Sequence, residues 1–126
     1  MATFADKPEI EKHLNDLDGE VFDFALRVRK VLPSEPARVY VASNEHYFRA
    51  RLAYHLYAHN VWIDHRGGAL PGSARCKPGE YIVVFRRNGV QYDPARQLLR
   101  WDEQPPLKAE LLLAEGGKAA FRILQE

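Results

Sequence analysis

Four histidines lie within twenty positions of the sequence and are the first residues that could carry chemistry. His55 and His59 are four positions apart on one face of a predicted helix, a spacing that can chelate a metal ion. A closed site needs two more ligands, and the nearby candidates are Asp64 and His65, because the single cysteine is far away in the chain. We therefore expect no metal site and no cofactor. A cationic His59 would instead suit the negative end of the helix dipole.

A second group of polar residues follows two predicted strands. Ser43, Asn44 and His46 come after the first strand, at the start of a helix, and Arg86 and Arg87 come after a later strand. If the two strands are parallel, these side chains meet beyond their carboxyl ends, where ligands of open α/β sheets bind. A helix N-terminus and planar guanidinium groups would favour a carboxylate, a phosphate or a uronic acid. The alternative is that these residues only cap a helix and end a hairpin.

Common catalytic signatures are missing from the sequence. It contains no GxGxxG, GxxxxGK[ST], GxSxG or HExxH motif, and the first strand-to-helix turn, residues 42–45, has no glycine for a phosphate to approach. An enzyme with His46 or His55 as general base would lack a nucleophile or a paired carboxylate. We therefore expect no catalytic residues. Arginines alternate with aromatics at 47–51, but a net charge of +1 argues against a nucleic-acid partner.

The elements that position these residues begin with a strand–helix–strand unit at 37–64. Val39 and Val41 mark a short strand, Ser43 and Asn44 are suitable N-caps, and the predicted helix runs from Asn44 to His59. Residues 61–63 then resume β character. Before this unit, apolar residues three and four apart predict an N-terminal helix at 8–32, which Gly19 could divide into two shorter helices. That helix could pack on the sheet or lead to a membrane span.

The second half of the chain reads as strands and hairpins at 80–126, after a loop at 65–79. The unbroken apolar run Tyr81–Phe85 predicts a strand buried on both faces. Asn88-Gly89 predicts a tight hairpin that pairs this strand with residues 90–92, and residues 115–118 predict a second hairpin. The fold class expected is α/β: a small Rossmann-like β-α-β core with a mixed sheet and a C-terminal antiparallel hairpin, in one domain, 1–126.

Composition and charge limit the possible classes. A chain of 126 residues with 46% hydrophobic content suits one domain, and its longest apolar runs are shorter than the roughly 18–20 residues of a membrane helix. The N-terminal residues do not resemble a signal peptide. One cysteine excludes an internal disulfide and leaves both cytosolic and extracytoplasmic locations open. Between residues 26 and 101 there are thirteen bases, most of them arginine, against five acids.

Two segments carry a resemblance to a known family. They are 47–61, which contains Arg-Leu-Ala-Tyr-His-Leu-Tyr-Ala-His-Asn-Val, and 77–93, which contains Lys-Pro-Gly-Glu-Tyr. Over about residues 20–103 the chain resembles the C-terminal extracytoplasmic region of bacterial multi-pass membrane proteins related to dolichyl-phosphate-mannose-type glycosyltransferases. Ala58 stands where that pattern has proline. The family's chemistry is expected to depend on acidic residues in membrane-proximal loops, and none can be matched here.

The resemblance implies a non-catalytic soluble domain on the extracytoplasmic (periplasmic) side of a bacterial membrane. Its partners would be the membrane-embedded portion of the parent protein and a glycan or lipid-linked sugar that the domain binds or positions. The rival hypothesis is a free-standing cytoplasmic α/β module that binds a small anionic ligand.

Overall fold

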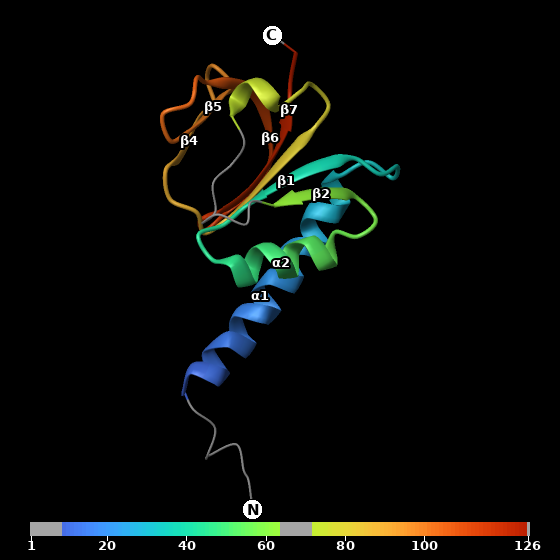
Figure 1. Ribbon diagram of the computed structural model, residues 1–126, viewed down its shortest axis with the longest axis vertical. Helices are drawn as coiled ribbons and strands as arrows, with labels where there is room; N and C mark the ends of the chain where they lie inside the picture. Colours follow the sequence, from blue (N-terminus) through green and yellow to red (C-terminus); the bar gives the residue numbers. More distant parts are fainter. Residues whose placement is uncertain (1–8, 64–71, 126) are drawn as a thin grey trace, which may run out of the picture.

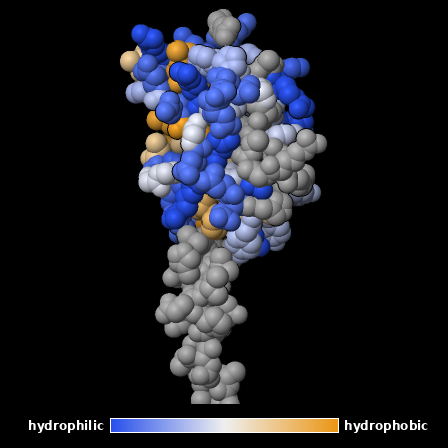
Figure 2. Space-filling view, turned by 60° about the vertical axis from the view of Figure 1, so that its left-hand side comes forward, coloured by the Kyte–Doolittle hydropathy of each residue, from blue (hydrophilic) through white to orange (hydrophobic). Residues whose placement is uncertain are grey.

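The computed structural model describes residues 9–63 and 72–125. The helices are α1 (Glu9–Val31) and α2 (His46–His55), and the strands are β1 (Arg38–Ala42), β2 (Asn60–Ile63), β3 (Tyr81–Phe85), β4 (Val90–Asp93), β5 (Leu98–Trp101), β6 (Leu107–Glu115) and β7 (Lys118–Ile123). The strands form a seven-stranded mixed sheet with the order β2-β1-β3-β7-β6-β5-β4, and both helices lie against the same side of it (Figure 1). The predicted α/β class is therefore confirmed, with a parallel part, β2-β1-β3, joined to antiparallel strands. Figure 2 shows one face of the domain, on which hydrophilic residues dominate and hydrophobic residues gather in small patches.

The predicted strand–helix–strand unit is present. It consists of β1 (Arg38–Ala42), α2 (His46–His55) and β2 (Asn60–Ile63), and β1 is parallel both to β2 and to β3 (Tyr81–Phe85). The helix is shorter than predicted at both ends. Its N-cap is Glu45, which makes no side-chain capping bond, while the Ser43 hydroxyl accepts a 3.3 Å hydrogen bond from the Glu45 N–H outside the helix. At the other end it stops at His55, because Leu56 leaves the helical conformation.

The N-terminal helix is a single element, α1 (Glu9–Val31), so Gly19 does not divide it. The apolar stripe keeps its phase beyond the glycine and is buried at Val21, Phe24 and Val28. Burial of this stripe outweighs the cost of about 1 kcal/mol for one glycine in a helix. Phe24 packs against Phe85 of β3, with ring centroids 5.8 Å apart, so the helix packs on the sheet.

The predicted hairpin between β3 and residues 90–92 is wrong. β4 (Val90–Asp93) pairs with β5 (Leu98–Trp101), and the free edge of β3 is taken by β7 (Lys118–Ile123). Gly89 does form a turn with a φ of 81°, but that turn carries the chain away from the edge of β3. The second predicted hairpin is confirmed: β6 (Leu107–Glu115) and β7 are joined through Gly116 and Gly117, both with positive φ.

A second hydrophobic core lies on the face of the sheet that the helices leave uncovered. Its largest fully buried members are Trp101, Ile82, Leu99 and Ile123. Here β4 comes close to β7, because the rings of Tyr92 and Phe121 lie 5.0 Å apart although two strands separate β4 from β7 in the sheet. The antiparallel end of the sheet therefore curls over its own face. Within the predicted loop 65–79, the described part contains a short 3-10 helix, η2 (Ser73–Arg75).

Neither helix in the described ranges is both long enough and apolar enough to cross a membrane.

Candidate functional site

The residues predicted to bind a ligand follow β1 and β3, which are parallel as the prediction required. Ala42 and Val84 are register partners, so both strands end at the same edge of the sheet. Ser43 is fully buried, and its carbonyl accepts a 2.6 Å hydrogen bond from Nη1 of Arg49. Asn44 is exposed, and the side chain of His46 lies outside the described part of the structure. Ser43 is therefore part of the buried interior of the strand-to-helix turn.

Arg86 and Arg87 point to opposite faces of the sheet. Arg86 binds both carboxylate oxygens of Glu20 on α1, at 2.9 and 2.8 Å. Arg87 binds both oxygens of Asp102, which follows β5, at 3.2 and 2.9 Å. Each guanidinium group thus has a carboxylate partner from a distant segment. Arg86 and Arg87 therefore do not meet at one point, but Arg87 lines the groove described next.

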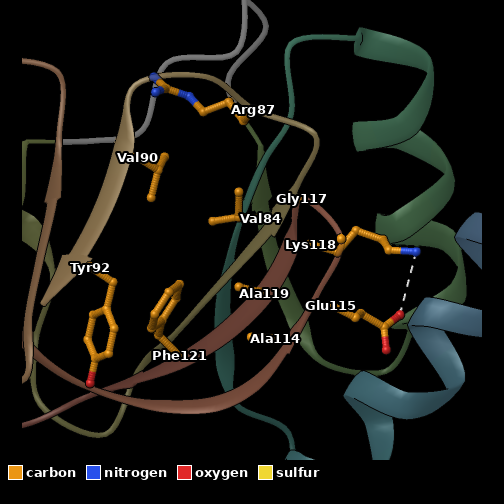
Figure 3. A pocket seen from close by; sticks show the side chains of 11 residues that line it. Val84, Arg87, Val90, Tyr92, Ala114, Glu115, Gly117, Lys118, Ala119 and Phe121 are labelled. Carbon is orange, nitrogen blue, oxygen red and sulfur yellow. Dashed lines mark ion pairs between the residues drawn. The ribbon is translucent and has the colours of Figure 1, made fainter. Parts of the chain in front are cut away.

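An open groove of about 390 Å³ lies at the carboxyl end of β3, between β4 and the β6–β7 turn (Figure 3). We call it the carboxyl-end groove. One side is formed by Val90 and Tyr92 of β4, which are half-buried, and Arg87 lies at its rim (Figure 3). The opposite side is formed by the Gly116-Gly117 turn, and the base by three apolar residues, Val84, Ala119 and Phe121.

Charged residues of the β6–β7 turn face away from this groove and toward α1 (Figure 3). Lys118 places Nζ 3.0 Å from Glu20 Oε1 and 3.5 Å from Glu115 Oε1. Glu115 also binds the guanidinium group of Arg27, through Nε at 2.9 Å and through Nη2. The hydrogen bond from Arg27 lowers the pKa of Glu115, and the hydrogen bond from Arg86 lowers that of Glu20. Both carboxyl groups therefore stay ionised and partnered.

The groove has the features of a binding site for a small amphipathic ligand. Ligand sites are concave, mostly apolar and equipped with a few polar groups, and their volumes are roughly 300–1,000 Å³. The apolar base offers contact area, while the guanidinium group of Arg87 and the main chain of the glycine turn offer polar contacts. Without a Cβ atom, Gly116 and Gly117 let a ligand approach the backbone closely.

A second pocket, of about 260 Å³, lies at the amino ends of β1 and β3. We call it the amino-end pocket, and it is lined by Arg38, Tyr40, Trp62, Arg75, Lys77 and Glu80. The Tyr40 hydroxyl donates a 2.9 Å hydrogen bond to Glu80 Oε1. Burial, together with this contact to Glu80, raises the pKa of Tyr40 to about 12, so the phenol stays protonated.

The sequence analysis did not predict the amino-end pocket, because it placed the candidate ligand site beyond the carboxyl ends of the strands. Arg38 and Tyr40 are two positions apart and therefore share one face of a strand, which is a signal in the sequence. Their closeness to Lys77 and Glu80 requires β1 and β3 to be neighbours, which is a tertiary property. Cys76 beside them is buried, and burial raises its pKa to about 11, which disfavours a reactive thiolate.

His55 and His59 do not share a helical face, because α2 ends at His55. The ring of His55 packs edge-on against Phe22, with centroids 5.2 Å apart, and Nδ1 of His59 accepts a 3.0 Å hydrogen bond from the Ala37 N–H. Across the described ranges, no three metal-ligating side chains gather. Asp64 and His65, the other ligands considered, lie outside those ranges. The absence of a metal site stays a prediction.

Comparison of the chain with protein-family models gives no match, and comparisons with curated proteins and with solved structures give none either. The class is therefore defined by the fold and the pockets alone. The chain is an α/β domain with a mixed, curled sheet and a pocket at each end of its parallel strands.

Proposed function

We propose that this chain is a non-catalytic binding domain that holds a sugar-containing or lipid-linked acceptor in the carboxyl-end groove. In this proposal it belongs to a membrane-associated protein of cell-surface glycan biosynthesis and is displayed on the extracytoplasmic side. The observation that carries the proposal is the groove itself, with its apolar base, its rim arginine and its exposed glycine turn. The residue patterns at 47–61 and 77–93 support the glycan context, since they carry the family resemblance.

The chemistry of the groove suits an amphipathic ligand. A sugar ring has apolar C–H faces that can pack on Val90 and Tyr92, and its hydroxyl or anionic groups can accept hydrogen bonds from Arg87. A polyprenyl phosphate combines an apolar chain with an anionic group in the same way. Arg87 already binds Asp102, so a ligand anion would share this guanidinium group, and we expect weak affinity.

The charged groups near the groove favour binding over catalysis. A general acid works best with a pKa near the working pH, whereas cationic neighbours hold the pKa values of Glu20 and Glu115 below the usual range. Glu20 lies on α1 and pairs with Arg86, and the Glu115 carboxylate points toward Arg27 of α1 rather than into the groove. The isolated domain is expected to turn over neither activated sugars nor phosphoesters, and turnover abolished by His55→Ala would overturn this part of the proposal.

Amide chemical-shift mapping tests the binding site. The probes are glucuronate, glucose 1-phosphate and farnesyl phosphate, the last as a short polyprenyl phosphate. Shifts are expected at Val84, Val90, Tyr92 and Ala119, and they should disappear in Ala119→Leu, which fills the groove. The matched control is Ala95→Leu, because Ala95 is exposed in the β4–β5 turn. The absence of shifts in the groove, or groove shifts that survive Ala119→Leu, would overturn the assignment.

The alternative, a free-standing cytoplasmic module that binds a small anion, is favoured by the cations of the amino-end pocket. Fractionation of cells that produce the native protein separates the two hypotheses. Recovery with the membrane, and cleavage by protease added to the extracytoplasmic side, would support the first. Recovery in the cytoplasmic fraction would support the second.

A further inference from the structure

Two sets of cations in the described ranges differ in their partners. At the helix-covered end of the sheet and along β7, Arg27, Arg86, Lys118 and Arg122 each form an ion pair with a glutamate. At the amino-end pocket, by contrast, Arg38, Arg75 and Lys77 line one small cavity, and none of the three forms an ion pair with any residue in the described ranges. The positive charge that gathers at this pocket is therefore not balanced by ion pairs.

The position of these cations follows from the fold. Arg38 opens β1, and Tyr40 lies two residues further along the same face. Tyr40 is the register partner of Trp62 on β2, and their rings lie 5.8 Å apart in an edge-to-face arrangement. Arg75 ends the short helix η2, and Lys77 follows two residues later. Three segments, β1, β2 and the stretch from η2 to Lys77, thus bring three cations and one half-buried indole to a single cavity.

Glu80, the one carboxylate among the described residues that line the pocket, offsets at most one of these three positive charges. Glu80 Oε1 accepts hydrogen bonds from the Tyr40 hydroxyl at 2.9 Å and from the backbone N–H of Lys77 at 2.8 Å. Oε1 of Glu80 is therefore already hydrogen-bonded to two groups of the pocket wall. Three cations remain against one carboxylate, and the guanidinium groups among them suit the planar, two-oxygen edge of a carboxylate or phosphate.

We propose that the amino-end pocket is an oxyanion-binding site, which takes the phosphate or carboxylate of a sugar-sized ligand whose ring packs against Trp62. This site lies at the opposite end of the parallel strands from the carboxyl-end groove. It goes beyond the proposed function and does not depend on it, since no residue is shared between the two pockets.

Intrinsic fluorescence gives a local readout. The chain has two tryptophans, of which Trp101 is only 1% exposed in the second core whereas Trp62 lines the pocket. Glucose 1-phosphate and glucuronate should each produce a saturable change, and the tighter of the two identifies the preferred anion. Inorganic phosphate should bind more weakly, and glucose should give no change. Equal binding of phosphate and glucose 1-phosphate would overturn the role of Trp62, and no saturable change with any anion would overturn the site.

Charge-removing variants locate the binding. Arg38→Gln and Lys77→Gln should each weaken binding about tenfold or more, because each removes a charge-assisted hydrogen bond. The matched controls are Arg100→Gln and Lys30→Gln, which remove the same charge from exposed positions on β5 and α1. Equal weakening by the controls would show that net charge, and not this pocket, attracts the anion. Amide spectra of all four variants establish that they fold. Binding to the carboxyl-end groove is tested separately, by the amide shifts of the residues that line that groove.

Discussion

The hydroxyl of Tyr92 on β4 donates a 2.9 Å hydrogen bond to the backbone carbonyl of Ala109 on β6. β5 lies between these two strands in the sheet, so the contact spans a neighbour and holds the curled end of the sheet closed. The Tyr92 ring also packs on Phe121 of β7 and forms one side of the carboxyl-end groove. The same side chain therefore links the stability of the curl to the shape of the groove.

Replacing Tyr92 by Phe should lower the free energy of unfolding by about 0.5–1.5 kcal/mol, because the ring is kept while the hydrogen bond to Ala109 is lost. Urea denaturation measures the change. Tyr54→Phe is the control, since Tyr54 is 72% exposed on α2, and its effect should stay within about 0.5 kcal/mol. Equal effects of the two substitutions would argue that the Tyr92 hydroxyl contributes nothing to stability.

Leu52→Ala should lower the free energy of unfolding by about 2–5 kcal/mol. Leu52 is fully buried where α2 packs on the sheet, and its truncation leaves a cavity in the core between the helices and the sheet. The matched control, Leu26→Ala, removes the same atoms from a side chain of α1 that is 45% exposed. If Leu52→Ala cost no more than Leu26→Ala in denaturant melts, α2 would not be packed as described.

Glu20→Gln should weaken the dependence of stability on pH in acid. The hydrogen bond from Arg86 lowers the pKa of Glu20 below its ordinary value of 4.5. Its contribution is therefore fully present above pH 4.5 and is lost as the pH falls through the folded-state pKa. Between neutral pH and this range, unfolding free energies from urea melts should fall less for Glu20→Gln than for the native chain. Glu35→Gln, at an exposed position, should leave the native profile in place.

His59→Asn should flatten the dependence of the unfolding free energy on pH in the range just below pH 6.5. Burial, aided by the charge of Arg29, lowers the pKa of His59 below 6.5, and its Nδ1 accepts the Ala37 N–H only when unprotonated. Stability from this group is therefore complete above pH 6.5 and falls as the pH drops toward the folded-state pKa. Asparagine keeps an acceptor oxygen but does not titrate. Identical slopes around pH 6.5 for His59→Asn and the native chain would rule out this contribution.

The sequence predicted those elements whose signals are local. The apolar stripe of α1, the strand–helix–strand unit and the Gly116-Gly117 turn all depend on residues close together in the chain, and all three are present. The prediction went wrong where a local signal competed with a distant partner. Asn88-Gly89 indicated that β3 pairs with β4, yet β7 occupies that edge of β3 with five register pairs, from Tyr81↔Arg122 to Phe85↔Lys118.

The candidate sites show the same division. Sequence alone determined that Arg86 and Arg87 follow a buried strand, because apolar periodicity and turn residues are encoded by neighbours in the chain. That this strand is parallel to β1 is known from the structure. Only the tertiary structure decided which carboxylate each arginine meets: Glu20, 66 residues away, and Asp102, 15 residues away. It also decided that Arg38, Arg75 and Lys77 share one cavity. Charge–charge contacts act through space over a few ångströms, so their partners exist only once strands distant in the sequence have been brought side by side.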